Sequence, residues 1–412
     1  MQLTTPVTLP RAKLAKRLGQ CAKVLAVLGL AGAPASADVL PDDRADVLYH
    51  NYDGGGITIQ GPSVLVRKKA GDHVSFFGSY YEDLISSASI DVKLSASPYH
   101  ETRKQEGGGV DFLYGKTIYT VGYIHSREPD YEANTAYYAI SQSMFGDLTT
   151  VTFGFRRGWD NVFRDIKVDG QIQNDPTFHQ QADHRAYSLS LSQILTRNAI
   201  LDLSFEAITD EGYLQSPYRE ILYVNPTSSG SFITAPQVYP NTRTSSAASA
   251  ELKYYLPYRA AVTGSYRYYS DTWGINGNTV EVDYTQPTLE HRLWGGSLIL
   301  DGSLRFYMQN HANFYMDEFP RADYQNFEAR DRELAAFHSY SLGFGASYEF
   351  PHYSWAPWMN KSSVSFHFNH LMINYSDFRN ELFTKFNGTA FADDPLYHLD
   401  ANVFQVFLSV WY

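Results

Sequence analysis

The stretch that decides the fold is Ala401-Asn-Val-Phe-Gln-Val-Phe-Leu-Ser-Val-Trp-Tyr412. Apolar and aromatic side chains recur in it at every second position, which places them on one face of an extended strand. That face carries Phe404, Val406, Leu408, Val410 and Tyr412. The opposite face, from Gln405 to Trp411, is mixed. The stretch is therefore predicted to be a β-strand with one apolar and one partly polar face.

The same alternation recurs along the chain. It is clear near 74–81, 150–156, 188–192, 201–207, 262–268, 304–309 and 341–350. A soluble β-sandwich would also alternate. Here, however, the polar face is mostly Ser, Thr, Gly and Tyr with few charges. The strands are also predicted to be about ten or more residues long, as a tilted membrane-spanning strand requires. The pattern favours an all-β, transmembrane antiparallel barrel.

The final stretch has the features of a closing strand. An apolar outer face, a mixed inner face and an aromatic end are typical of the last strand of a bacterial outer-membrane barrel. Such a strand resembles the signal read by the barrel-assembly machinery, which is therefore an expected partner, with the apolar face Phe404 to Tyr412 as the signal. An edge strand of a soluble sheet is the alternative for this stretch alone.

The N-terminus predicts secretion. Five basic residues precede any acidic one, and Val24 to Ala33 forms a short apolar core. Ala35-Ser-Ala37 is a small-residue cleavage site, so residues 1–37 are predicted to be a cleaved signal peptide and 38–412 the outer-membrane barrel domain. The expected location is the outer membrane, reached through the inner membrane.

Composition narrows the function classes. The single cysteine, Cys21, lies in the predicted signal, so no disulfide is expected in residues 38–412. Removing five positive charges changes the formal charge from −11 to −16, which argues against nucleic acid as a partner. The chain has no remaining run of about 18 apolar residues, so helical spans are not expected. The 32 tyrosines suit the aromatic girdles of a barrel.

Short and long connections alternate. Short turns are predicted at 69–72, 114–116, 145–148, 196–198, 256–258 and 301–302, with a longer turn at 351–361. Long polar segments lie near 86–101, 160–181, 212–243, 273–285, 316–333 and 377–400. Short periplasmic turns and long extracellular loops are the outer-membrane arrangement. With a first strand near 45–52 that turns at Gly54-Gly-Gly56, the count is about sixteen strands; fourteen is the alternative.

Several stretches resemble a family of Gram-negative outer-membrane proteins described only as a domain of unknown function. They are Asp42-Asp-Arg-Ala-Asp-Val-Leu-Tyr-His50, Tyr52-Asp-Gly-Gly-Gly56, Gly61-Pro-Ser-Val-Leu-Val-Arg-Lys68, Ser86-Ser-Ala-Ser-Ile-Asp-Val92, Ser95-Ala-Ser-Pro-Tyr99, Asp130-Tyr-Glu-Ala-Asn-Thr135, Phe145-Gly-Asp-Leu-Thr149 and Arg157-Gly-Trp-Asp160. The resemblance is dense in the N-terminal half and looser afterwards. It implies a barrel in the outer membrane, but it implies no activity and no functional residue.

The candidate site residues are charges on the predicted inner face. They are Arg67, Arg156, Arg267, Arg305, Asp202, Glu206 and Glu349. Charge at membrane depth persists only when it faces water or a partner. In an open pore these residues would set ion selectivity. In the alternative they pair with one another and fill the lumen, and the sequence leaves both possibilities open.

Other motifs carry less chemistry. Gly54-Gly-Gly56 has no GK[ST] after it and is read as a turn. Gly107-Gly-Gly109 is read as a bulge or a close approach of strands. His367 and His370 fall on opposite strand faces, so neither a metal nor another cofactor is predicted. No local nucleophile motif such as G-x-S-x-G is present.

Three functions follow as hypotheses. The first is a porin-like barrel for the passage of small polar solutes or ions. The second is a closed or plugged barrel that serves as a structural or docking component of an envelope complex, since aromatic residues such as Phe77 and Tyr307 also fall on the inner face. An outer-membrane hydrolase is third. Expected partners are outer-membrane lipid and lipopolysaccharide, which the charged external loops would meet, and an unidentified periplasmic protein.

Overall fold

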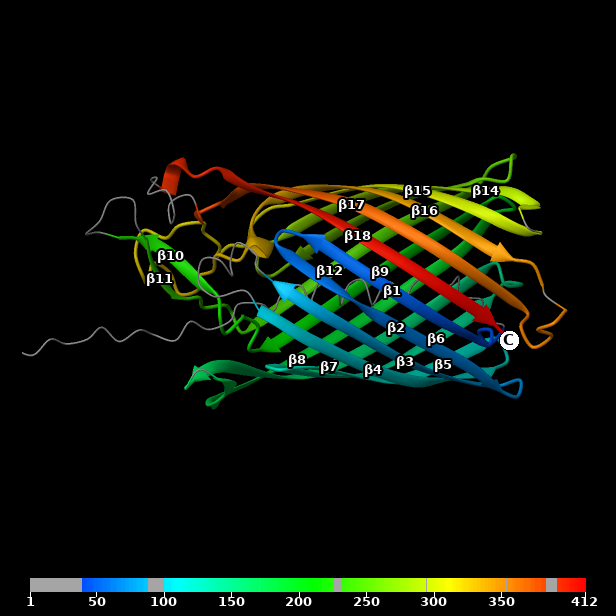
Figure 1. The fold of residues 1–412 in the computed structure, drawn as a ribbon, viewed down its shortest axis with the longest axis horizontal. Helices are drawn as coiled ribbons and strands as arrows, with labels where there is room; N and C mark the ends of the chain where they lie inside the picture. Colours follow the sequence, from blue (N-terminus) through cyan, green and yellow to red (C-terminus); the bar gives the residue numbers. More distant parts are fainter. Residues whose placement is uncertain are drawn as a thin grey trace, which may run out of the picture.

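The chain folds as one closed barrel (Figure 1). The computed structural model describes residues 39–87, 99–169, 171–225, 232–293, 295–352, 354–382 and 391–412. The predicted signal peptide, 1–37, lies outside the described residues. No helix in the described part is long and apolar enough to cross a membrane. Sixteen antiparallel strands close the barrel, as predicted, and the alternative of fourteen is wrong.

The strands are long, and most exceed ten residues. In chain order they are β1 (Arg44–Gly54), β2 (Ile57–Ala70), β3 (Val74–Ser87), β4 (Tyr99–Tyr114), β5 (Thr117–Glu128), β6 (Tyr131–Met144), β7 (Thr149–Val168), β8 (Gln171–Thr196), β9 (Ala199–Gly212), β10 (Glu220–Val224), β11 (Phe232–Pro236), β12 (Thr242–Tyr255), β13 (Ala261–Asp271), β14 (Asn276–Leu293), β15 (Gly296–Gln309), β16 (Phe337–Phe350), β17 (Lys361–Arg379) and β18 (Leu396–Trp411). Two short 3-10 helices, η1 (Arg332–Leu334) and η2 (Phe391–Asp393), lie in connections.

Each barrel strand pairs with its neighbours in sequence, with two exceptions. The hairpin β10–β11 forms a separate two-stranded sheet, so β9 pairs directly with β12. The barrel closes where β1 pairs with β18, from Arg44 opposite Trp411 to Gly54 opposite Ala401. The stretch that ends at Tyr412 is therefore the closing strand.

The alternation in the sequence becomes two faces of the wall. Directly paired residues share a face, so Leu408 lies on the same face as Val47, and Leu304 on the same face as Leu342. On this face Leu304 is 62% exposed and Leu342 56% exposed. An exposed belt of apolar and aromatic side chains on every barrel strand fits contact with lipid. The complementary positions point into the barrel.

Six of the seven predicted short turns are confirmed. The turn predicted at Asp301-Gly302 is wrong, because both residues lie inside β15 and pair with β14 and β16. The chain instead turns at the end of β14, before Gly296, where Gly295 has a φ of +78°. Glycine adopts a positive φ without steric cost, whereas Gly302 serves only as a small outward-facing residue.

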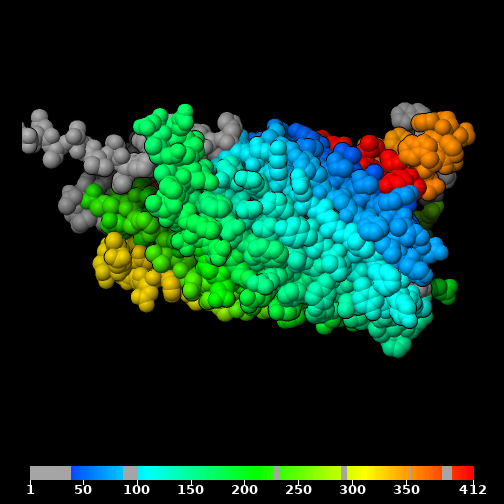
Figure 2. All heavy atoms as spheres, turned by 90° about the horizontal axis from the view of Figure 1, so that it is seen from below, coloured from blue at the N-terminus to red at the C-terminus, as the bar shows by residue number. Residues whose placement is uncertain are grey.

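Two predicted loops are mostly strand. Residues 160–168 and 171–181 form the part of the β7–β8 hairpin that projects beyond the barrel, at the end where the long connections lie (Figure 2). Their polar sequence resembles a loop because both faces of a hairpin beyond the membrane meet water. Residues 273–285 belong mainly to β14, which follows a tight turn. In that turn Asp271 Oδ1 accepts the Trp273 and Ile275 amides at 3.0 and 2.9 Å.

The remaining predicted long connections lie at the same end of the barrel. The segments 212–243 and 316–333 fall in the β9–β12 and β15–β16 connections. The segments 86–101 and 377–400 are described only in part. The end with these connections is called the loop end below, and the opposite end, where Tyr412 lies, is called the turn end. Short turns therefore occupy the turn end and the long connections lie at the loop end, as predicted, although β1–β2 and β5–β6 are joined at the loop end by tight turns.

Candidate functional site: the inner wall and its cap

All seven predicted charges lie on the inward face. Arg156 pairs with Tyr137 and Ala186, and Glu206 pairs with Ser188 and Ala247. None of these positions belongs to the exposed apolar belt. The same register argument applies to the others: their direct partners are Phe77, Glu251, Ser249, Glu281 and Ser363. These positions therefore have the register of the inward face, and their role in ion selectivity is a proposal.

Arg67 is held by a carboxylate that the sequence did not suggest. It forms a short ion pair with Asp111 on β4, and its guanidinium lies 4.7 Å from the centre of the Phe77 ring. Asp111 also accepts the Thr120 hydroxyl at 2.6 Å. Both charged side chains are largely buried. Arg67 therefore occupies space along the inner side of the barrel wall near the turn end.

Arg156 and Arg267 are less constrained. Arg156 Nη2 lies 3.9 Å from Glu206 Oε1, at the limit of an ion pair, and both side chains are about one-third exposed. Arg267 is exposed, and its guanidinium lies 5.9 Å from the Tyr269 ring. Among the described residues Arg267 has no carboxylate partner. A guanidinium without an acid at this depth must be solvated inside the barrel.

The inward face of β9, β12, β14 and β15 is acidic. Lys253 Nζ lies 3.3 Å from Asp202 and 2.8 Å from Glu251, so one ammonium serves two carboxylates. Arg305 lies 3.8 Å from Glu281. Glu349, on β16, instead pairs with Lys361 at the turn end. Arg305, Asp202 and Glu349 are therefore each joined to a charge that the sequence did not single out.

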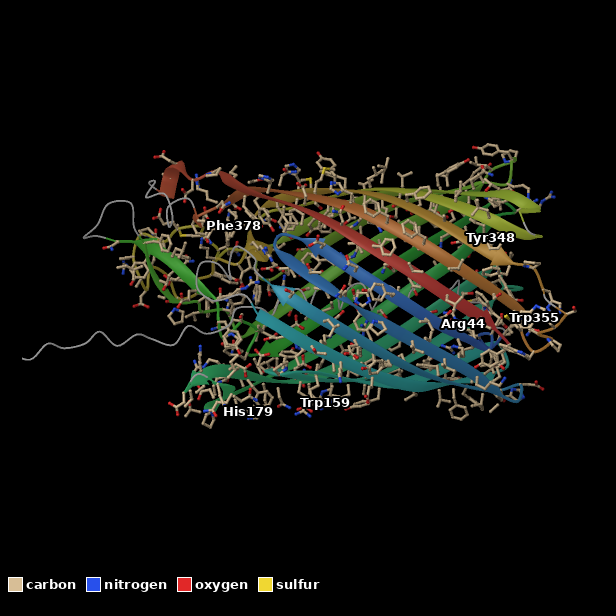
Figure 3. All side chains as sticks on the ribbon, viewed as in Figure 1. Arg44, Trp159, His179, Tyr348, Trp355 and Phe378 are labelled. Carbon is tan, nitrogen blue, oxygen red and sulfur yellow. The ribbon has the colours of Figure 1, made fainter. Side chains whose placement is uncertain are left out.

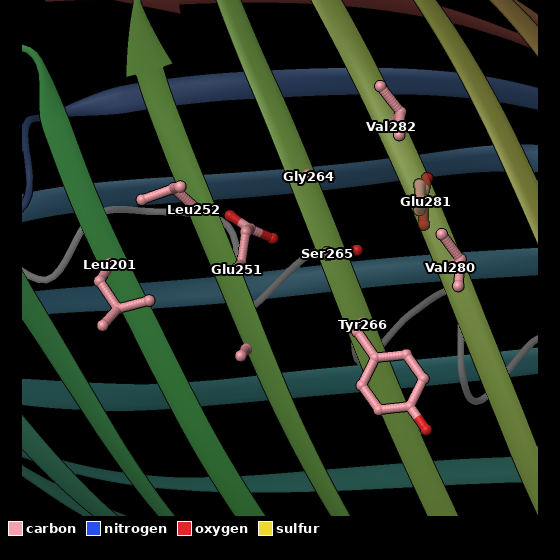
Figure 4. A pocket seen from close by; sticks show the side chains of 10 residues that line it. Leu201, Glu251, Leu252, Gly264, Ser265, Tyr266, Val280, Glu281 and Val282 are labelled. Atoms are coloured by element: carbon pink, nitrogen blue, oxygen red, sulfur yellow. The ribbon is translucent and has the colours of Figure 1, made fainter.

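The outer surface of this acidic sector is apolar. A shallow depression lies at Gly264, which has no side chain, and leucine, valine and tyrosine side chains surround it (Figure 4). Glu251 and Glu281 belong to the same strands but have the inward register. Their alternation with Leu252 and with Val280 and Val282 is the signal by which sequence analysis would have found them.

A buried polar cluster lies on the inward face of β1, β3 and β4. His50 Nε2 is 2.8 Å from Asp83 Oδ1, and the imidazole stacks on Tyr81 with ring centres 4.9 Å apart. Arg103 lies 3.7 Å from Asp83 and donates to Ser126 at 3.3 Å. These contacts join residues 20 or more positions apart, and no sequence motif marks them. The nearby serine bonds to Arg103, so the hydrolase hypothesis gains no support here.

The long connections fold together into a cap. The cap comprises residues 213–225, 232–241, 272–275, 310–336 and 376–382. Its apolar core is Tyr239, Trp273, Ile275, Ala312, Phe314, Tyr315, Ala329, Leu334 and Ala335, with Tyr375 at the end of β17 and Phe378. The inward-facing strand residues Tyr269, Phe337 and Ile373 pack against this core. The cap is thus attached to the inner wall at the loop end, where Phe378 lies (Figure 3).

Arg330 is the central charge of the cap. It donates to both oxygens of Glu381 at 2.6 and 2.8 Å and to Asp317 Oδ1 at 2.8 Å. Its guanidinium also lies 4.4 Å from the Phe378 ring. Burial alone would lower the pKa of Arg330, but the charges of Glu381 and Asp317 raise it above its usual value. The β15–β16 connection is therefore held to the segment after β17 by a charged, buried contact.

A second arginine extends the same network. Arg219 Nη1 lies 2.6 Å from both Asp331 and Glu333. Asp331 also accepts the Tyr239 hydroxyl. Because Asp331 directly follows Arg330 in the chain, the two arginine centres form one continuous cluster. This cluster joins the β9–β12 and β15–β16 connections.

Tyr218 connects the β9–β12 part of the cap to the rim of the barrel near β5, β6 and β7. Its hydroxyl donates to Asp130 at 2.6 Å and accepts the Asp165 amide at 2.6 Å. Burial raises the pKa of Tyr218, and the Asp130 charge raises it further. Asp130 lies between β5 and β6, far around the barrel from Glu381. Contacts through Tyr218, Arg219, Asp331 and Arg330 thus run across the loop end.

Two groups of side chains carry donor atoms of the kinds that bind metal ions. Glu101, Glu128 and Asp130 bring carboxylate oxygens within 4.8 Å of one another near the rim, but acidic groups commonly gather without an ion. His367 contacts the inward-facing Phe407, whereas His370 bonds to Asn402 on the other face. The two histidines therefore cannot share an ion. Neither arrangement defines a metal site.

A closed antiparallel barrel with an apolar outer belt and a polar inner wall is a transmembrane β-barrel. The chain belongs to the family described as "Protein of unknown function (DUF3570)", whose model matches residues 91–359. This confirms the family that the sequence resembles. No protein in the curated collection matches the chain.

Solved structures with a similar arrangement are distant in sequence. A bacterial polysaccharide outer membrane secretin is 7% identical over 90% of this chain and 100% of its own, with a TM-score of 0.47. Pseudomonas aeruginosa OccK7 (OpdD) is 10% identical over 90% and 98%, with a TM-score of 0.41. A Pseudomonas aeruginosa FadL homologue is 11% identical over 92% of each chain, with a TM-score of 0.39.

Proposed function

We propose that this barrel lets small polar solutes or ions cross the bacterial outer membrane. The observation that carries the proposal is the state of Arg267, which is exposed on the inward face without a carboxylate partner among the described residues. A guanidinium keeps its charge inside a membrane only in contact with water or an anion. A barrel of about sixteen strands is wide enough to hold water.

The inner wall would act on solutes through unevenly distributed charge. The acidic sector around Glu251 and Glu281 attracts cations, while Arg156 and Arg267 are available to anions. Fixed charges of both signs on a wet wall orient dipolar solutes and shift ion preference. The pathway is therefore proposed to favour small charged or zwitterionic solutes over neutral apolar ones.

The cap would control access. Outer-membrane barrels place long loops outside and short turns in the periplasm, so the cap would face the exterior. Because its core packs on Tyr269 and Phe337 of the inner wall, the cap would narrow the entrance. The same observation supports the second candidate, a plugged barrel in an envelope complex, in which the cap closes the lumen completely.

Single-channel current in a planar bilayer tests the first proposal. Wild-type chain 38–412 should give discrete current steps, and removing the inward charges with Arg156→Gln and Arg267→Gln should shift ion preference towards cations. Arg197→Gln, in the turn after β8, is the matched control and should leave ion preference unchanged. A silent bilayer that contains folded wild-type protein would contradict passage and favour the plugged barrel.

A further inference from the structure

The outward face of β6–β8 changes abruptly from aromatic to charged. Tyr138, Phe155 and Tyr187 form one row, with successive ring centres 5.7 and 5.0 Å apart. The next outward positions towards the loop end on β7 and β8 are Arg157 and Arg185. These two arginines are therefore the first charges beyond the apolar belt on this part of the surface.

Arg157 and Arg185 are direct cross-strand partners. Their side chains are 53% and 43% exposed, and they share one carboxylate, Asp183. Arg157 Nη2 lies 2.8 Å from Asp183 Oδ2, and Arg185 Nε lies 3.0 Å from Asp183 Oδ1. Glu211 stands opposite Asp183 but forms no ion pair with either arginine in the described part of the chain. Like charges opposite each other on a sheet are unfavourable unless an anion separates them.

The aromatic neighbours show the depth of this pair. Trp159, the next outward residue on β7, is 39% exposed and lies outside the barrel wall (Figure 3). Its ring centre is 6.2 Å from that of Tyr123, which is also exposed. Tryptophan and tyrosine gather where lipid tails meet head groups. Arg157 and Arg185 therefore lie at the level of lipid head groups.

The neighbouring basic pair differs in one respect. Lys104 on β4 and Arg127 on β5 are also cross-strand partners on the outward face. Here each base has an acid on its other side, because Glu82 is opposite Lys104 and Glu132 is opposite Arg127. This pair is balanced by register, whereas Arg157 and Arg185 depend on a single shared carboxylate. At Arg157 and Arg185, two positive charges therefore share one negative charge.

We infer that Arg157 and Arg185 bind a phosphate group of a phosphorylated glycolipid in the leaflet that surrounds the loop end. Guanidinium groups match phosphate with paired, charge-assisted hydrogen bonds. The exposed Trp159 ring offers an apolar surface for the sugar that carries the phosphate. The inference rests on the proposed outer-membrane placement, in which this leaflet contains lipopolysaccharide, but it does not depend on passage through the lumen.

Lipid retention by purified chain 38–412 in detergent tests this inference. The probes are lipid A with both phosphates, the same lipid A after dephosphorylation, and phosphatidylglycerol, each detected by native mass spectrometry. The double variant Arg157→Gln/Arg185→Gln should bind phosphorylated lipid A on the order of tenfold more weakly than wild type. Lys104→Gln/Arg127→Gln is the matched control on the balanced pair and should lose much less.

Weaker binding confined to the Arg157/Arg185 variant and to phosphorylated lipid A supports the site. Equal retention by that variant and wild type, or equal retention of dephosphorylated lipid A, overturns it. Equal loss of phosphatidylglycerol and lipid A overturns the assignment to a glycolipid. Unchanged current steps in the same variant would show that passage and lipid binding are separate, because both residues face away from the lumen.

Discussion

Arg330 donates hydrogen bonds to both carboxylate oxygens of Glu381, at 2.6 and 2.8 Å, in the interior of the cap. Glu381 is completely buried, so water cannot replace the contact if either partner is removed. Breaking one side of a buried ion pair typically costs about 3–5 kcal/mol. This contact therefore joins the β15–β16 connection to the segment after β17 and contributes to the stability of the cap.

The first prediction concerns that contact. Glu381→Gln should destabilise the cap locally by about 3 kcal/mol, because it leaves the Arg330 charge undercompensated. Hydrogen exchange of amides in 312–335 should accelerate, while amides in β2–β6 should not change. The double variant Arg330→Met/Glu381→Leu removes both charges and should exchange much closer to wild type. Equal acceleration in the single and double variants would contradict this explanation.

The second prediction concerns the contact between Tyr412, at the end of the closing strand, and β2. Lys68 Nζ lies 4.6 Å from the Tyr412 ring centre, and the Tyr412 hydroxyl donates to the Arg67 carbonyl at 3.1 Å. Tyr412→Ala should lower the free energy of unfolding in micelles by about 1–2 kcal/mol. Tyr412→Phe keeps the ring and should lose less than half of that. An unchanged urea midpoint for Tyr412→Ala would count against a stabilising role for this contact.

The third prediction uses two neighbouring glycines. A Cβ on Gly109 would lie 2.4 Å from the Phe77 ring and 2.5 Å from the Val121 carbonyl oxygen. On Gly108, which faces outward, the nearest atom is at 3.4 Å. Gly109→Ala should therefore destabilise the barrel by about 1–3 kcal/mol, and Gly108→Ala should have little effect. Thermal unfolding followed by the heat-dependent gel shift compares them; equal midpoints would refute the close approach.

The fourth prediction is a pH dependence of the cap. Burial raises the pKa of Glu318 above 4.5, and the Asp317 charge raises it further. A carboxyl with a raised folded-state pKa favours the folded state when protonated, and this contribution is lost as pH rises through that pKa. Glu318→Gln should therefore slow cap hydrogen exchange relative to wild type at pH 7 but not at pH 4. A larger benefit at pH 4 would reverse the expected sign.

The barrel could be predicted from sequence because its physics is local. A period of two assigns each side chain to a face without knowledge of its partner, and by this rule Arg156 and Leu304 fall on opposite faces of the wall. Short turns were visible because they need residues that tolerate tight geometry. The turn prediction at Asp301-Gly302 fails because Asp-Gly is typical of a tight turn, whereas a single glycine can also lie inside a strand.

The cap could not be predicted because its contacts are remote. Arg219 meets Glu333 across 114 positions, and Tyr218 meets Asp130 across 88. Neither spacing follows a helix or strand period, so the segments were recognised only as polar and charged. The ion-pair partners of the wall charges, such as Asp111 and Lys253, could not be predicted for a different reason. The register between strands decides which acid lies beside which base, and the sequence alone does not give that register.

The most direct test of a water-filled lumen uses the absence of cysteine from residues 38–412. Arg267→Cys and Tyr266→Cys place a single thiol on opposite faces of β13, one inward and one in the lipid belt. Both variants are exposed to a charged, membrane-impermeant thiol reagent after folding into vesicles. We expect rapid labelling of Arg267→Cys and almost none of Tyr266→Cys. The reverse order, or an unreactive Arg267→Cys in folded protein, would contradict a hydrated lumen lined by this residue.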